Sequence, residues 1–414
     1  MKPGYKQTEV GVIPEEWEAK PLKGRVSIAH GFPFASEHFT SSGTYRLATP
    51  GHFYEEGGFR DIGEKQKFFV GQVPRDYVLR PGDLIVAMTE QADGLLGSAA
   101  VIPETEVYLH NQRLGRVRVL TSEIDLSYLF WVFNSSSYRT KVRETAAGTK
   151  VKHTSPEKLL EISVRLPPPP EQRAIAEALS DVDGLLGGLD RLMAKKRDLK
   201  QAAMQQLLTG QTRLPGFHGE WEVSTLQGAS DCLDGVRVPL NEAQRAQRRG
   251  DYPYCGANGV LDYVDGYVID DDIILMAEDG GYFDEYEHRP IAYRMKGKCW
   301  VNNHAHILKA KAGFDQGFLF YSLVHKNILP YLASGTRAKL NKSEMNKVEV
   351  RSPKEESEQT AIAAVLTDMD EELAALEQRR AKTRALKQGM MQELLTGRTR
   401  LVAGAAVKHA ELKP

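Results

Sequence analysis

The chain has 414 residues, of which 41% are hydrophobic, a composition typical of a packed protein with two or three domains. No run of roughly 18 apolar residues occurs and the first residues lack the apolar core of a signal peptide, so we expect neither a membrane span nor a leader. The net charge is −1, so a nucleic-acid-binding role would require a local basic face.

Residues 1–165 are predicted to form a first globular domain of mixed α+β type. Short segments of alternating apolar and polar residues dominate it, at 44–50, 76–89, 99–103 and 114–120. Turn-forming residues such as Pro81-Gly82-Asp83 separate these segments, as expected between strands.

A loop of glycine, threonine and basic residues closes the first domain. It runs Gly148-Thr149-Lys150-Val151-Lys152. The glycine would let backbone amides approach an anion, and Thr149, Lys150 and Lys152 could complete a clamp for a DNA phosphate. The alternative is a turn that leads into the next helix and carries solvated lysines. The sequence leaves both interpretations open.

Residues 166–212 are predicted to form a long helical region. Apolar residues recur at intervals of four and three, the spacing of a coiled-coil seam, at Ile175, Leu179, Val182, Leu186 and Leu189. Prolines 167–170 are typical of a helix start and Gly210 of its end. The helix would have about 39 residues and a length of roughly 58 Å.

The second half of the chain repeats this plan. A second globular domain is predicted at 213–352, with strand-like segments at 252–281 and 299–310. Its closing loop carries Thr336, Arg337 and Lys339, and a second helical region is predicted at 353–400, before a tail at 401–414. The second seam comprises Ile362, Leu366, Met369, Leu373 and Leu376.

Three segments of the first half recur 187 residues further along the chain. RAIAEALSDVD (173–183) matches TAIAAVLTDMD (360–370), LKQAAMQQLLTGQTRL (199–214) matches LKQGMMQELLTGRTRL (386–401), and GTKVK matches GTRAK. Because neither helix is stable alone with one apolar stripe, we expect the two to form an antiparallel coiled coil in a pseudo-twofold molecule. Matched helices with dissimilar domains suggest that two different targets are bound at a fixed distance.

Side-chain chemistry indicates the candidates for DNA base recognition, because arginine pairs with guanine and asparagine or glutamine with adenine. In the first domain they are Arg46, Asn111, Gln112 and Arg113. In the second they are Asn258, Asn302 and Asn303, although Asn258-Gly259 is also turn chemistry.

Several segments resemble the specificity subunits of type I restriction-modification systems. The repeated helix ending in LLTG resembles their conserved regions, LRPGDLIVAM (79–88) and HNQRLGRVRV (110–119) resemble a first target-recognition domain, and YCGANGVLDYVDGY (254–267) and WVNNHAHIL (300–308) resemble a second. The resemblance follows the family's order of domain, helix, domain and helix.

The resemblance implies a cytoplasmic, non-catalytic subunit that recognises a bipartite sequence in double-stranded DNA. Separate modification subunits would dock on the helices and methylate adenine with S-adenosylmethionine. Separate restriction subunits would use ATP and Mg²⁺ to cleave unmodified DNA. No cofactor is expected in this chain itself.

The motif inventory agrees with a chain that has no active site. We find no GxxxxGK[ST] phosphate loop and no FxGxG with [DN]PP[YF] methyltransferase pair. Cys232, Cys255 and Cys299 are widely spaced, which favours neither disulfides nor a zinc site. His304 and His306 share a strand face, but no third metal ligand is indicated by spacing, so packed or hydrogen-bonded roles are favoured.

Two other functions remain open. One is an enzyme with unrecognised motifs, which methyl transfer by the purified chain alone would reveal. The other is a coiled-coil adaptor that binds only proteins, which sequence-specific DNA protection by the assembled complex would exclude.

Overall fold

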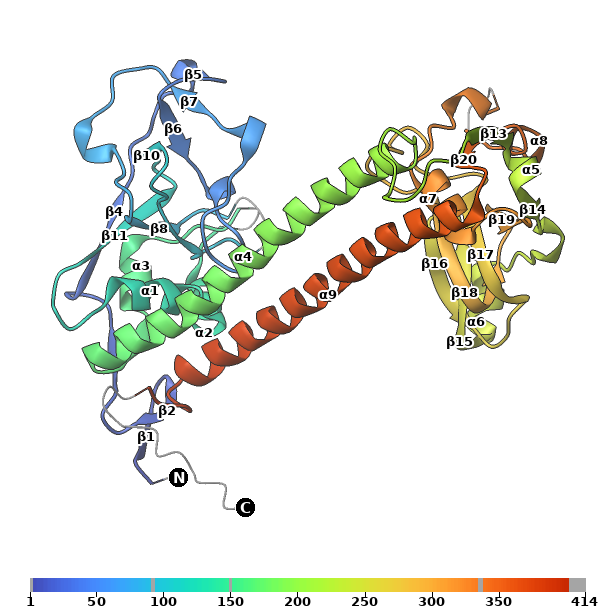
Figure 1. The fold of residues 1–414 in the computed structure, drawn as a ribbon. Coiled ribbons are helices and arrows are strands. Elements are labelled where there is room, and N and C mark those ends of the chain that lie inside the picture. The colour runs from blue at the N-terminus through green and yellow to red at the C-terminus, as the bar shows by residue number, and fades with distance from the viewer. Residues whose placement is uncertain (1–2, 91–93, 149–150, 334–337, 402–414) are drawn as a thin grey trace. The chain divides into compact units, whose positions relative to one another are not determined.

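The computed structural model describes residues 3–90, 94–148, 151–333 and 338–401. The chain forms two compact units, one from residues 1–188 with 380–414 and the other from residues 189–379 (Figure 1). Two long helices, α4 (Pro169–Leu207) and α9 (Glu356–Leu394), contribute to both units. Each unit is therefore built from both halves of the sequence. Among the described residues, no helix is long and apolar enough to cross a membrane.

In its described residues, the first unit combines two four-stranded sheets with three short helices. The sheets have the strand orders β10-β6-β7-β5 and β4-β11-β8-β9, and β1-β2 and β12-β3 form small pairs. The strands are β1 (Tyr5–Thr8), β2 (Gly11–Pro14), β3 (Glu18–Pro21), β4 (Val26–His30), β5 (Phe39–Thr40), β6 (Tyr45–Ala48), β7 (Phe68–Phe69), β8 (Leu84–Ala87), β9 (Ala99–Val101), β10 (Val107–His110), β11 (Leu114–Val119) and β12 (Ser163–Leu166). The helices are α1 (Leu126–Phe133), α2 (Ser136–Thr145) and α3 (Pro156–Glu161).

The second unit is organised around one six-stranded sheet of order β14-β19-β17-β18-β15-β16, with β13 and β20 paired separately. The strands are β13 (Trp221–Thr225), β14 (Ser230–Cys232), β15 (Arg249–Gly256), β16 (Gly259–Val264), β17 (Ile269–Ala277), β18 (Ala292–Val301), β19 (Ala305–Ala310) and β20 (Glu349–Pro353). The helices are α5 (Leu226–Ala229), α6 (Glu242–Gln247), α7 (Gln316–Val324) and α8 (Lys342–Met345).

In the first unit, the start of α4 packs against the end of α9. Ile175 and Leu179 share a buried apolar cluster with Leu394 and Leu395. Trp17 donates its indole N–H to Glu171 at 3.0 Å, and Arg400 donates to the same carboxylate at 2.7 and 2.9 Å. The chain direction of the two helices is therefore opposite, as expected for an antiparallel pair.

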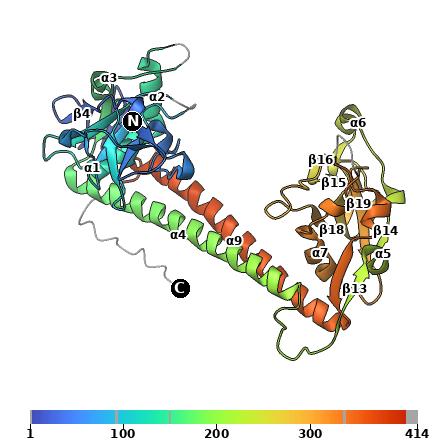
Figure 2. The ribbon, with the colours of Figure 1, turned by 90° about the horizontal axis from the view of Figure 1, so that it is seen from above.

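The second unit has equivalent contacts, in which α4 and α9 have changed places. The end of α4 packs on the start of α9 through a cluster that includes Leu207, Ile362 and Leu366. Arg213 donates two hydrogen bonds to the buried Glu358, each at 2.5 Å. Figure 2 shows α4 and α9 side by side within each unit.

The two repeats thus form the same ion pairs twice, each time between an acid of one copy and a basic residue of the other. Glu171 and Glu358 are 187 residues apart, as are Arg213 and Arg400, and each acid of one copy meets the arginine of the other. The same exchange joins Asp183 to Lys387 in the first unit and Asp370 to Lys200 in the second. Antiparallel packing causes this exchange, because it brings the start of one repeat beside the end of the other.

One glutamine in each repeat attaches the globular domain to its long helix. Gln172 donates to the carbonyls of Glu123 and Pro167 and accepts from the amide of Asp125, the residue that caps α1. Gln359 bonds in the same way to Gly313, Pro353 and Asp315, the residue that caps α7. The two attachments use the same backbone geometry although the domains differ in sequence.

The expected helix length is confirmed. Both helices have 39 residues. Ile175, Leu179, Leu189, Ile362 and Leu366 are buried, whereas the other seam positions, Val182, Leu186, Met369, Leu373 and Leu376, are half-buried. Ile175, Leu179, Ile362 and Leu366 belong to clusters that also contain residues of a globular domain, whereas the buried Leu189 lies near the middle of α4.

Candidate nucleic-acid interface

A three-residue turn of the first unit presents three of the candidate residues. Asn111, Gln112 and Arg113 connect β10 to β11. The side-chain oxygen of Asn111 accepts a hydrogen bond from the amide of Arg113 at 3.0 Å, which fixes the turn. Gln112 and Arg113 are exposed, and among the described residues nothing pairs with the guanidinium of Arg113. Both side chains can therefore reach an external partner.

The glycine of the loop that closes the first domain has a required conformation. Gly148 has a φ of +102°, and a Cβ built there would lie 2.2 Å from the carbonyl oxygen of Val151. Only glycine fits such a close approach of backbone to backbone. Thr149 and Lys150 lie outside the described residues.

This loop and the 111–113 turn adjoin at the end of β8. The amide of Met88 donates to the carbonyl of Arg113 at 3.0 Å, and the amide of Thr154 donates to the carbonyl of Met88 at 3.0 Å. Lys152 is exposed, and the amide of Glu90 donates to its carbonyl at 2.9 Å. The structure therefore brings a phosphate candidate and base-recognition candidates together, although they are about 40 residues apart in the sequence.

Arg46 has a different environment. It lies on β6, in the other sheet of the first unit, and its guanidinium pairs with Glu106 at 2.7 Å. It also covers the ring of Phe68 at 5.5 Å from the centroid. A contact with a base would have to break this pair, so the geometry gives Arg46 less support than Arg113.

The second unit places its candidates at the end of β17 in the same way. The turn from β18 to β19 contains Asn302, Asn303 and His304, and Asn302 Oδ1 accepts from the amide of His304 at 2.8 Å. Asn302 is only 4% exposed, so its role in this structure is to hold the turn, whereas Asn303 is exposed. Asn258, in the β15–β16 turn, donates to the carbonyl of Gly280 at 2.9 Å.

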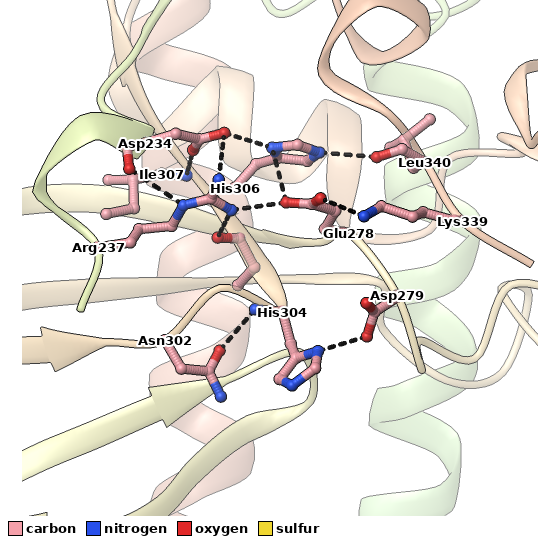
Figure 3. Close-up of polar contacts among 11 residues, drawn as sticks. Asp234, Arg237, Glu278, Asp279, Asn302, His304, His306, Ile307, Lys339 and Leu340 are labelled. Atoms are coloured by element: carbon pink, nitrogen blue, oxygen red, sulfur yellow. Dashed lines mark hydrogen bonds and ion pairs between the residues drawn. The ribbon is translucent and has the colours of Figure 1, made fainter. Parts of the chain in front are cut away.

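The second closing loop is tied to a buried charge cluster (Figure 3). Lys339 lies 2.9 Å from Glu278, whose other oxygen lies 2.6 Å from Arg237. Thr336 and Arg337 lie outside the described residues. Lys339 therefore has an internal counter-charge, whereas among the described residues no acidic group pairs with the equivalent Lys152.

His306 is the centre of this cluster. Its Nδ1 is 2.7 Å from Asp234 and its Nε2 is 2.8 Å from the carbonyl of Leu340. Burial by itself would lower the pKa of His306, but the bonds to Asp234, Cys232 and Leu340 outweigh it and raise the pKa to about 9. The favoured interpretation of His306 as a hydrogen-bonded residue agrees with this arrangement.

His306 also belongs to a group of side chains that could bind a metal ion by their type and spacing. Ligand atoms of Cys232, Asp234 and His306 lie within 4.8 Å of one another. Both nitrogens of His306 are engaged in hydrogen bonds, so the imidazole offers no lone pair to a metal ion in this arrangement. The cluster acts as an ion-pair anchor for the strand end and the closing loop.

We predict that the second unit loses stability in alkaline solution through His306. The pKa of about 9 lies above the ordinary value of 6.5, so protonation stabilises the fold. That contribution is complete below about pH 6.5, declines above it and is gone once the pH passes about 9. Melting temperatures of wild type and His306→Asn at pH 6.5, 8 and 9.5 test this. The variant should melt lower and depend less on pH, and parallel profiles would contradict the prediction.

The structure reveals a correspondence that sequence analysis missed. His304 occupies the third position of the second turn, as Arg113 does in the first, and the amide of Glu278 donates to its carbonyl as that of Met88 does to Arg113. The two positions are 191 residues apart rather than 187, so the repeat did not align them. The shared asparagine two residues before each was the only available signal.

Comparison with known proteins agrees with this duplicated plan. A family model described as "Type I restriction modification DNA specificity domain" matches twice, at residues 14–190 and 218–384. The chain is 24% identical over 445 residues to a putative type I restriction enzyme MjaX specificity subunit from Methanocaldococcus jannaschii, a match that covers 96% of this chain and 97% of that protein.

A second relative and a solved structure are also similar. The chain is 34% identical over 153 residues to the putative type I restriction enzyme specificity subunit S.HindORF215P of Haemophilus influenzae, covering 37% of this chain and 38% of that protein. The match to the MjaVIII specificity subunit of M. jannaschii covers 50% of the length of that protein. The fold is similar to that of a type I restriction-modification S subunit from M. genitalium, with a TM-score of 0.64 and 16% identity over 95% of this chain and 99% of that one.

The two matches to the family model together cover most of the sequence, and each match takes in one globular domain with much of its long helix. The chain therefore belongs to the family of type I restriction modification DNA specificity domains, of which it carries two.

Proposed function

We propose that this chain is the specificity subunit of a type I restriction-modification complex and recognises a bipartite sequence in double-stranded DNA. One observation carries the proposal. In each unit, a turn with exposed polar side chains and a closing loop with basic residues meet at the end of the equivalent strand, β8 or β17. Protein–DNA interfaces need both kinds of group, because phosphate contacts fix position and base contacts give specificity.

Within each unit the proposed contacts divide by chemistry. Gln112 and Arg113 in the first unit, and Asn303 in the second, are exposed donors suited to base edges. Lys152 is suited to a phosphate, as are Thr149, Lys150, Thr336 and Arg337 by sequence. Asn302 is not proposed to contact a base, because its side chain is buried in the turn.

The chemistry of the complex belongs to other subunits in this proposal. Modification subunits bind S-adenosylmethionine and methylate adenine, and restriction subunits use ATP and Mg²⁺, while this cytoplasmic chain holds no cofactor and catalyses no reaction. Leu192 and Leu199 are 40% and 47% exposed on α4, seven residues apart. An apolar stripe at heptad spacing suits a docked helix of a partner subunit.

Reconstitution with modification subunits tests the proposed function. The complex should protect one bipartite DNA sequence from nuclease digestion and methylate it, and the chain alone should transfer no methyl group. Methyl transfer by the chain alone would favour the enzyme alternative. A complex that assembles but protects no DNA would favour the adaptor.

We predict that Lys152→Ala weakens DNA binding more than Lys339→Ala. Loss of one phosphate contact should lower affinity for cognate and random DNA alike and reduce the slope of log affinity against log salt by about one. Lys339 must leave Glu278 to bind a phosphate, so its removal should change the slope less. Salt titrations of the two variant complexes measure this, and equal slopes for both variants and wild type would contradict it.

A further inference from the structure

We propose that His304 recognises a base of the second half-site and is the functional counterpart of Arg113 in the first. This inference rests on the proposed function. It starts from a correspondence in backbone geometry rather than in sequence, since the two side chains differ and their positions do not align in the 187-residue repeat.

The two turns are built from the same hydrogen bonds. In each, an asparagine side-chain oxygen accepts from the amide two residues later, at 3.0 Å in the first unit and 2.8 Å in the second. In each, the carbonyl of that later residue accepts a hydrogen bond from a backbone amide. The donor is the residue just after β8 or β17, which is Met88 or Glu278. The carbonyls of Met88 and Glu278 in turn accept hydrogen bonds from residues just after the closing loop, through the amides of Thr154 and Leu340. Arg113 and His304 therefore leave the backbone at equivalent points.

The side chain of His304 is positioned for an external contact. It is 42% exposed, and its Nδ1 lies 2.5 Å from the carboxylate of Asp279. Figure 3 shows the other ring nitrogen on the side away from Asp279, and among the described residues no group bonds to it. A carboxylate that holds one nitrogen fixes the orientation of the ring and thereby the direction of the other. The imidazole thus presents one hydrogen-bonding atom, Nε2, at a defined place.

The neighbouring residues have structural roles that His304 lacks. Asn302 is buried in the turn, and His306 has both ring nitrogens bonded within the protein. Asp279 is itself only 14% exposed, and serves here to orient the ring. His304 and the exposed Asn303 are therefore the two side chains of this turn that can reach a base edge.

The chemistry of the two residues predicts unequal contributions. A guanidinium can form two parallel hydrogen bonds with one guanine, whereas Nε2 of an imidazole forms one. We expect Arg113→Ala to lower discrimination at one base pair of the first half-site by roughly a hundredfold, and His304→Ala to lower it at one base pair of the second by roughly tenfold. Each change should leave the other half-site unaffected.

The test uses full-length chains assembled with modification subunits, with methylated adenines mapped across a genome and binding measured on cognate and random DNA. His304→Ala should relax one position of the second half-site, and His304→Arg should change the preferred base there. His218→Ala, an exposed histidine between α4 and β13, should leave the motif unchanged. Melting temperatures should match wild type for all three, because His218 is exposed and, within the described ranges, the His304 side chain hydrogen-bonds to Asp279 alone.

Two results would overturn the inference. One is a second half-site that keeps its full sequence in both His304 variants. The other is an equal loss of affinity for cognate and random DNA, which would make His304 a phosphate contact. In either case the wild-type complex would still methylate a bipartite sequence. Failure of the wild-type complex to do so would instead reject the proposed function itself.

Discussion

Replacing Leu366 by aspartate should destabilise the second unit by at least about 4 kcal/mol, since the change removes buried apolar volume and inserts a carboxylate. Leu366 is 0% exposed and packs in a cluster with Leu207, Phe318, Tyr321 and Ile362. The free energy of unfolding of a domain is typically about 5–15 kcal/mol. We therefore expect a large loss of folded protein or a much lower melting temperature, measured by calorimetry or by urea titration.

Exposed leucines of α4 provide the matched control. Leu192→Asp and Leu199→Asp make the same chemical change where the residue is already 40% or 47% exposed, so stability should change by only about 1 kcal/mol. Both should nevertheless weaken assembly with modification subunits if the stripe docks a partner helix. Leu186 and Leu373, which are half-buried, should give intermediate losses. Equal melting of the Leu366 and Leu192 variants would argue against the buried seam.

Exchanging residues 215–350 for the second domain of another family member should change one half of the methylated sequence and preserve the other. The reason is that the two repeats share the polar contacts that attach each domain to the helices, and the apolar contacts of Phe318 and Tyr321 with Leu366 are the ones that a donor domain must also supply. Arg213 and Glu358, which lie outside the exchanged segment, form the ion pair, and Gln359 binds backbone groups of Gly313 and Asp315. Backbone partners can be supplied by a domain of different sequence.

These contacts determine how the chimaera should be designed. The donor domain should carry a tryptophan equivalent to Trp221, which Arg213 covers at 5.8 Å from the ring centroid, and a capping residue equivalent to Asp315. The reciprocal exchange of residues 1–165 is the control and should change only the other half-site. Methylation mapping of both chimaeras measures the outcome. A chimaera that folds and methylates but has altered both half-sites would contradict independent recognition by the two domains.

The sequence alone was sufficient to predict the order of domains and helices. The 187-residue repeat, the spacing of the seam and the proline and glycine boundaries predicted two 39-residue helices with a globular domain before each. These features are local or periodic, so the sequence expresses them directly. The repeat also predicted that the helices pair, because each copy has one apolar stripe and needs a partner to bury it.

The environment of the candidate residues depended on the tertiary structure. Lys339 and Lys152 are equivalent in the repeat, yet Glu278, 61 residues before Lys339, neutralises only one of them. Asn302 is a recognition candidate by type, but the fold buries it in a turn and exposes His304 instead. Such differences arise because a side chain's exposure and charge partners come from strands distant in sequence, whereas the shared turn is held by backbone bonds that do not depend on residue type.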